Sequence, residues 1–125
     1  MRPVYLIAGI GLLGGSIALS LRRTQPGCRI HVYGRDGERL QRACSLGYAD
    51  GWSTTLEAIP RDARGAFVCT PVDLVPEIVC RLLELTGDAA FVTDVGSTKA
   101  GIVRRVQQEA VSADRFVGSH PMAGS

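Results

Sequence analysis

The sequence has 125 residues, 46% of them hydrophobic, and its 14 basic and 12 acidic residues give a net charge of +2. This length corresponds to one domain with a sizeable core, and the balance of interleaved charges argues against a dedicated nucleic-acid surface. No apolar run is long enough to span a membrane and no secretory leader opens the chain, so we expect a cytoplasmic protein without a membrane partner.

The four cysteines are too far apart to form a CxxC pair, so their spacing predicts neither a metal site nor a redox site. We expect no bound metal. We expect reduced, buried cysteines that pack as small hydrophobic residues, at Cys28, Cys44, Cys69 and Cys80.

Apolar runs alternate with helical periods along the chain, a pattern typical of a parallel sheet with helices on both faces. In the first half we predict strands at 3–9 and 29–34, helices at 13–24 and 36–47, and a short edge strand near 49–53. Gly47 is placed to end the second helix. The inward faces of the two helices are predicted at Leu13, Ile17, Leu21, Leu40, Ala43 and Cys44.

The second half continues the same alternation. We predict strands at 65–71, 90–96 and 115–120, and helices at 73–87 and 97–110. The apolar stripe of the helix at 73–87 is predicted at Val75, Ile78, Val79 and Leu82. With about six strands, no internal repeat and no linker, residues 1–125 are expected to form a single domain.

The segment GIGLLG, from Gly9 to Gly14, matches GxGxxG where a predicted strand leads into a predicted helix. Gly9 permits a tight turn, Gly11 lets the backbone approach a pyrophosphate, and Gly14 allows close helix–strand packing. The helix N-terminus, with the backbone of Leu12 and Leu13, would then face the phosphates. The alternative is a glycine-rich turn that binds nothing. In this context the motif favours a doubly wound, mostly parallel α/β fold of the Rossmann type.

Asp36 lies at the end of the second predicted strand, where an acid can accept hydrogen bonds from both ribose hydroxyls of the adenosine half. A carboxylate there repels a 2′-phosphate and favours NAD over NADP. The neighbouring Arg35 could offer a guanidinium to that phosphate, which keeps NADP possible. Asp36 could also simply cap the helix that begins at Gly37.

Three further polar or turn-forming segments each follow a predicted strand. Because open α/β sheets bind ligands at the carboxyl ends of their strands, these segments should line one crevice together with the glycine-rich loop. They contain Thr70 and Pro71, Gly96 and Ser97, and Gly118 to His120. His120 is a candidate catalytic base, although a lone loop histidine is usually structural.

Taken together, GIGLLGGSIA (9–18), DVGSTK (94–99) and GSHPMAGS (118–125) resemble the nucleotide-binding half of the prephenate and arogenate dehydrogenases of tyrosine biosynthesis. The resemblance runs along the whole chain, and the pairing of the last two segments is its most specific part. It implies oxidation of a ring alcohol by hydride transfer to NAD or NADP, followed by loss of carbon dioxide and aromatisation.

The resemblance also implies roles for individual residues. His120 would accept the alcohol proton, and Ser97 would orient the hydroxyl or the histidine, although Ser97 could instead cap its helix. Thr70 and Pro71 would line the path to the nicotinamide ribose, together with Gly96. Lys99 could meet a substrate carboxylate, but a first-turn lysine facing solvent is the simpler reading.

In that family a helical domain follows, forms a homodimer and completes the substrate pocket. No such segment occurs in these 125 residues, so we expect them to be a piece of a longer protein that binds cofactor but does not turn over substrate alone.

Two other functions remain open from the sequence. Another small-substrate oxidoreductase, such as a β-hydroxyacid dehydrogenase or an imine reductase, would use the same first half of the chain. A dinucleotide-sensing module would need neither Ser97 nor His120.

Overall fold

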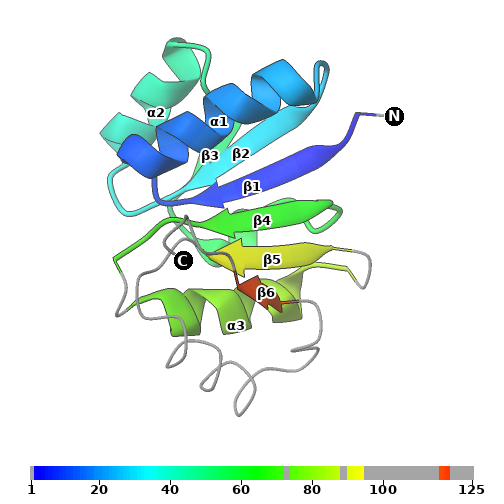
Figure 1. Cartoon of the computed structure of the whole chain (residues 1–125). Coiled ribbons are helices and arrows are strands. Elements are labelled where there is room, and N and C mark those ends of the chain that lie inside the picture. The colour runs from blue at the N-terminus through cyan, green and yellow to red at the C-terminus, as the bar shows by residue number, and fades with distance from the viewer. Residues whose placement is uncertain (1, 72–73, 88–89, 95–115, 119–125) are drawn as a thin grey trace, which may run out of the picture.

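A computed structural model of the chain describes residues 2–71, 74–87, 90–94 and 116–118. Its centre is a six-stranded parallel sheet in the order β3-β2-β1-β4-β5-β6 (Figure 1). The strands are β1 (Val4–Ala8), β2 (Arg29–Tyr33), β3 (Gly51–Ser53), β4 (Gly65–Val68), β5 (Phe91–Asp94) and β6 (Phe116–Gly118). The strand order reverses beside β1, the first strand, so the carboxyl ends of β1 and β4 border a crevice of the kind where such sheets bind ligands.

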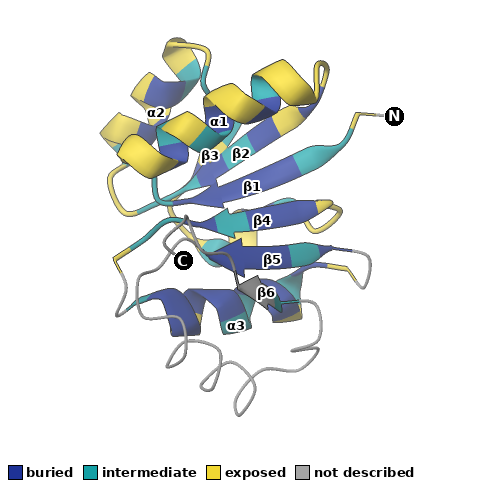
Figure 2. Cartoon of the chain, in the orientation of Figure 1, coloured by how far each residue is buried: buried dark blue, intermediate teal, exposed yellow. Residues whose placement is uncertain are grey.

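Helices cover both faces of the sheet, as predicted, and their inner surfaces are buried (Figure 2). The described helices are α1 (Leu12–Thr24), α2 (Gly37–Ser45), α3 (Val75–Leu85) and a 3-10 turn, η1 (Leu56–Ala58). One apolar cluster joins α1 and α2 to the sheet, and the other joins α3 and η1 to the opposite face. The core strands are apolar on both sides: Ile7, Val32, Val68 and Val92 are fully buried, which is worth about 1.5–3 kcal/mol for each such side chain.

The predicted apolar stripe of α3 is confirmed, because Val75, Ile78, Val79 and Leu82 are all buried. In α2, Leu40 and Ala43 are buried as predicted, and Gly47 follows the helix with a φ of +89°. Cys44 is only half-buried because it lies at the edge of that inner face.

The predicted stripe of α1 is wrong at its first residue, since Leu13 is 53% exposed. The buried positions are Gly14, Ala18 and Leu21, with Ile17 half-buried among them. The reason is the close approach of Gly14 to β1, which turns the helix so that positions three and four residues beyond Gly14 face the sheet. The sequence also gave no sign of η1, and the helix predicted at 97–110 lies outside the described residues.

The cysteine prediction is correct for Cys28, a free and buried thiol. Cys44 and Cys69 are free but half-buried, and Cys80 is half-buried as well, so the expectation that all four are buried is wrong. Cys69 is partly open because it borders a cleft at the end of β4. In the part of the chain that the structure describes, no helix has the length and apolar character needed to cross a membrane.

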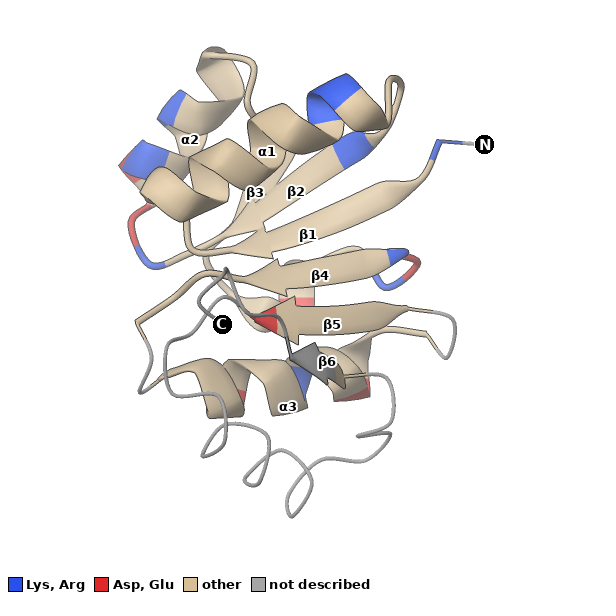
Figure 3. Cartoon of the chain, viewed as in Figure 1, with Lys and Arg blue, Asp and Glu red and all other residues tan. Residues whose placement is uncertain are grey.

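Charged side chains lie mostly on the helices and the turns between elements (Figure 3). Inside the sheet, Arg29 of β2 and Asp94 of β5 are charged residue types. His31 of β2 is titratable as well, and its Nε2 lies 2.9 Å from Ser53 Oγ on β3. Burial, and then the charge of Arg29, lowers the pKa of His31 below 6.5. The edge strand is therefore held by a neutral imidazole.

This contact predicts a pH dependence of stability. Because the pKa of His31 is lower in the folded chain than in the unfolded chain, its contribution is fully present above about pH 6.5 and is lost as the pH falls through the folded value. We expect the free energy of unfolding, measured by urea titration, to fall between pH 7 and pH 5. His31→Gln should flatten that part of the profile. An unchanged slope in this variant would contradict the assignment.

Candidate cofactor site

The glycine-rich loop between β1 and α1 is held from both sides at the centre of the sheet. The Gly9 N–H donates to Tyr33 O at 2.8 Å, and the Cys69 N–H donates to Ala8 O at 2.7 Å. Gly9 has a φ of +95°, and a Cβ there would lie 2.9 Å from the carbonyl oxygen of Cys69. Only glycine fits this turn without strain.

The two other glycines of the motif differ in what surrounds them. A Cβ on Gly14 would collide with the carbonyl oxygen of Gly9, so this position needs glycine for the helix to lie close to the loop. A Cβ on Gly11 would meet no atom of the described chain within 4 Å. The space over Gly11 is open, which is what the approach of a phosphate to the backbone requires.

The N-terminus of α1 lacks the usual side-chain partner. Its N-cap is Gly11, no side chain of the described residues caps it, and no acidic residue lies in its first turn. Leu12 is 93% exposed and points away from the core. The first backbone N–H groups and the positive end of the helix dipole are thus available to an anion.

Asp36 follows β2 and caps α2. Its Oδ1 accepts from the N–H groups of Glu38 at 3.1 Å and Arg39 at 3.3 Å. Both bonds use the same oxygen, so Oδ2 is the atom that can accept from a sugar hydroxyl. The structural role and the proposed ribose contact are compatible in one carboxylate.

The opposite wall comes from the end of β4 and from α3. Thr70 Oγ1 is buried and has no hydrogen-bond partner among the described residues, and Pro71 lies beside it at the edge of the cleft. Burial, together with the negative charge of Asp94, raises the pKa of the Cys69 thiol to about 11. This thiol is therefore protonated at neutral pH, the form in which a cysteine is a weak nucleophile.

These walls enclose a cleft of about 590 Å³ at the carboxyl ends of β1, β2 and β4. That volume suits a small ligand or one half of a dinucleotide. The cleft is lined by Gly9, Ile10, Gly11, Tyr33, Gly34, Arg35, Asp36, Arg39, Leu40, Leu56, Cys69, Thr70, Pro71, Leu74, Glu77, Ile78 and Arg81. Gly9, Gly11, Arg35, Asp36, Thr70 and Pro71 were predicted from the sequence. Leu12 and Gly14 shape the loop without lining the cleft, and Leu13 is exposed on α1.

Sequence reasoning missed several lining residues. Arg39 could have been found because it lies one turn after Asp36, but its contact with the loop joins residues 29 positions apart. Leu74 is the N-cap of α3, and Ile78 and Arg81 follow it at spacings of four and three. The helical period had assigned Ile78 to the core and gave no reason to select Leu74 or Arg81.

The predicted catalytic residues fall beyond the described part of the chain. Gly96, Ser97, Lys99 and His120 lie outside the described residues. The strands that precede them are described, and Asp94 of β5 pairs with Gly118 of β6 in the parallel ladder. Asp94 is fully buried at that point.

Comparison with known proteins places this geometry in a family. Residues 17–125 match the family described as prephenate dehydrogenase, nucleotide-binding domain. The chain belongs to this family. The fold described above is therefore that of a prephenate dehydrogenase nucleotide-binding domain.

Comparisons with single proteins of known activity or known structure point to the same family. Prephenate dehydrogenase of Bacillus subtilis is 36% identical over 129 aligned positions, which cover 100% of this chain and 34% of that protein. The structure of prephenate dehydrogenase from Aquifex aeolicus, in complex with hydroxyphenyl propionate and NAD+, superposes with a TM-score of 0.85 at 33% identity and covers 100% of this chain and 43% of its own. The structure of Synechocystis arogenate dehydrogenase superposes with a TM-score of 0.81 at 30% identity, and the alignment covers 98% of this chain and 42% of the Synechocystis chain. The chain thus spans less than half the length of these prephenate and arogenate dehydrogenases.

Proposed function

We propose that this chain is the cofactor-binding part of a dehydrogenase that oxidises prephenate or arogenate with NAD. The main support for this proposal is the cleft at the carboxyl ends of β1, β2 and β4. The uncapped N-terminus of α1, the open space over Gly11 and the Asp36 carboxylate come together there. The complex of the Aquifex aeolicus relative with NAD+ supports the same cofactor here.

The residues present fit a dinucleotide. The pyrophosphate would accept hydrogen bonds from the backbone at Gly11, Leu12 and Leu13, since the α1 N-terminus carries no competing acid. Asp36 would accept from the ribose hydroxyls. Thr70 Oγ1, which has no partner among the described residues, would donate to the ligand, and the apolar Leu74 and Ile78 would flank the adenine.

For the chemical step, the bound nicotinamide supplies the hydride acceptor. His120 would take the proton of the substrate's ring alcohol as the carbonyl forms, because neutral imidazole is a base near pH 7. Ser97 would orient that hydroxyl or the imidazole, and Gly96 would line the nicotinamide end. The carbon–carboxylate bond then breaks and carbon dioxide leaves. The electrons of that bond complete the aromatic ring, and the former carbonyl oxygen would take back the proton held by His120. The pairing of Asp94 with Gly118 supports this assignment, since the segments with Ser97 and His120 follow neighbouring strands.

The remainder of the protein would supply what this domain lacks. We propose a second, helical domain that closes the substrate pocket and forms a homodimer, in keeping with relatives more than twice as long as this chain. We place the enzyme in the cytoplasm, where thiols such as Cys28 stay reduced.

The cofactor assignment predicts that the 125-residue chain binds NAD more tightly than NADP, because the Asp36 carboxylate repels a 2′-phosphate. Asp36→Asn keeps a good helix cap but removes the charge, so it should narrow the difference between the two dissociation constants. Calorimetric titration of both nucleotides checks this.

Glu38→Gln is the matched control, because Glu38 is the other acid in the first turn of α2 and does not line the cleft. It should leave both dissociation constants unchanged. Tighter binding of NADP than NAD by the unaltered chain would contradict the role given to Asp36.

A further inference from the structure

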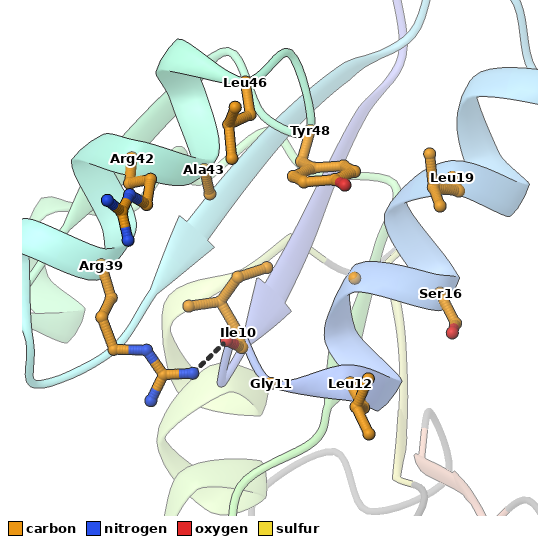
Figure 4. Close-up of a pocket in the computed structure, with 11 residues that line it drawn as sticks. Ile10, Gly11, Leu12, Ser16, Leu19, Arg39, Arg42, Ala43, Leu46 and Tyr48 are labelled. Atoms are coloured by element: carbon orange, nitrogen blue, oxygen red, sulfur yellow. Dashed lines mark hydrogen bonds between the residues drawn. The ribbon is translucent and has the colours of Figure 1, made fainter.

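Among the described residues, two carboxylates line the cofactor cleft of about 590 Å³, Asp36 and Glu77. Asp36 has a place in the proposed ribose contact, and Glu77 has none. The neighbouring cavity of about 470 Å³, between α1 and α2, is lined by no acidic residue of the described chain (Figure 4). An acid in the binding site of an anionic cofactor weakens binding unless it meets a cation or a hydrogen-bond donor. Glu77 therefore needs such a partner.

The cation nearest to Glu77 along α3 is not that partner. Arg81 follows Glu77 by four residues, and an acid placed four residues before a base is the order that favours an ion pair on a helix. Arg81 instead contacts Glu57 of η1 at 2.6 Å and Glu84 at 3.3 Å. Within the described part of the chain, the Glu77 side chain forms no ion pair. Its carboxylate is left available to a ligand.

Glu77 lies beside apolar side chains on the part of α3 that borders the cleft. Glu77 and Ile78 follow Leu74 by three and four residues, and all three line the cleft, so they share one side of the helix. Leu56 of η1 adds another apolar side chain to the lining. Apolar side chains with one polar group among them suit a planar, mostly apolar ring that has a polar edge.

The adenine of the cofactor is the group that this end of the cleft would receive. In the proposed site the pyrophosphate lies at the N-terminus of α1 and the ribose lies at Asp36, so the base lies beyond the ribose. Adenine carries an amino group with two N–H donors at position 6 of its edge. A carboxylate beside that edge would accept a charge-assisted hydrogen bond.

We propose that Glu77 is a specificity-determining residue that selects adenine among purine bases by accepting a hydrogen bond from its 6-amino group. The inference rests on the proposed function, because it requires a dinucleotide in this cleft. Hypoxanthine carries a carbonyl oxygen in place of the amino group. That oxygen would face the Glu77 carboxylate with no proton between them, so a hydrogen bond is lost and a repulsion is added.

The test is calorimetric titration of the 125-residue chain with NAD+ and with nicotinamide hypoxanthine dinucleotide. The unaltered chain should bind NAD+ about tenfold more tightly, the lower end of what a hydrogen bond to a charged group gives, because Glu77 is exposed. Glu77→Gln should bring the two dissociation constants within about threefold of each other. A glutamine amide accepts from the amino group through its oxygen and donates to the carbonyl group through its nitrogen. NAD+ should therefore bind this variant more weakly, and the hypoxanthine dinucleotide should bind it more tightly.

Glu84→Gln is the matched control. It removes the other carboxylate of α3, which does not line the cleft, and it should leave the preference for NAD+ unchanged. An acid in the first turn of a helix also stabilises the helix dipole. If that is the whole role of Glu77, Glu77→Gln will lower the free energy of unfolding and leave the preference for NAD+ at its original value, a result that would overturn the inference.

The failure of this inference is distinguishable from the failure of the proposed function. Equal affinity of the unaltered chain for the two dinucleotides would overturn the inference and leave the proposed cofactor site intact. If the chain binds neither dinucleotide, the proposed cofactor site fails and the inference fails with it.

A measurement on the unaltered chain covers the case in which the variants do not fold. Purine riboside has a hydrogen atom in place of the 6-amino group of adenosine, so it lacks the donor without adding a repulsive oxygen. Adenosine should displace NAD+ at a concentration about threefold to tenfold lower than purine riboside does. Equal displacement by the two nucleosides would contradict the role given to Glu77.

Discussion

Replacing His120 with Asn in the full-length enzyme should lower the turnover number by about a hundredfold to ten-thousandfold, the contribution of a positioned general base. Asn can still form hydrogen bonds, but it takes up no proton at neutral pH. The Michaelis constant for NAD should stay nearly constant, because the proposed contacts of the pyrophosphate and the ribose are at the α1 N-terminus and at Asp36, not at residue 120.

The pH profile gives this prediction a second readout. The unaltered enzyme should lose activity as the pH falls through the pKa of the proposed base, since imidazolium does not accept a proton, and His120→Asn should lose that acid limb. His31→Gln is the control, because the only other histidine of the sequence lies in β2, hydrogen-bonded to Ser53. Near-normal turnover by His120→Asn, with the acid limb retained, would assign proton transfer to another group.

The second large effect is expected at Gly14. A Cβ there would run into the carbonyl oxygen of Gly9 and would lie 3.3 Å from Ile7 Cγ2, so either α1 or the loop must move. We expect Gly14→Ala to lower the free energy of unfolding by about 1–3 kcal/mol, as overpacking usually does. Displacement of the loop should also raise the dissociation constant for NAD by about tenfold or more, because hydrogen bonds to a charged group are sensitive to geometry.

The next residue of the helix provides a matched control. A Cβ on Gly15 would meet nothing within 4 Å, and Gly15 does not line the cofactor cleft. Gly15→Ala should therefore raise the free energy of unfolding by about 0.5–1 kcal/mol through helix propensity, and leave NAD affinity unchanged. Denaturant titration and calorimetry measure both quantities. Equal behaviour of the two alanine variants would contradict the packing role of Gly14.

Much of the fold follows from local sequence. The buried runs around Ile7, Val32 and Val68 predict strands, the stripe from Val75 to Leu82 predicts α3, and the GxGxxG segment predicts the turn between β1 and α1. These features depend on periodicity and on backbone freedom, both of which are visible in a short window.

The errors concern properties that depend on distant residues. The close approach of Gly14 to Gly9 and Ile7 determines which face of α1 lies against the sheet. The helical period alone therefore did not reveal that Leu13 is exposed. The half-buried state of Cys69 follows from the cleft beside it, which forms only when α2 and α3 are both in place. The bond from Arg39 to Ile10 is likewise a product of the fold, and no local pattern indicates it.

The place of β1 in the sheet also bears on how the protein is made. β1 is synthesised first and lies inside the sheet, paired with β2 on one side and with β4 on the other. On the ribosome, the β1 edge that pairs with β4 stays bare until residues 65–68 have left the exit tunnel, and its sequence, VYLIA, is almost wholly apolar. An unpaired apolar edge is a template for association with other chains. Nascent chains that stall before β4 should therefore be the most aggregation-prone and the most dependent on chaperones.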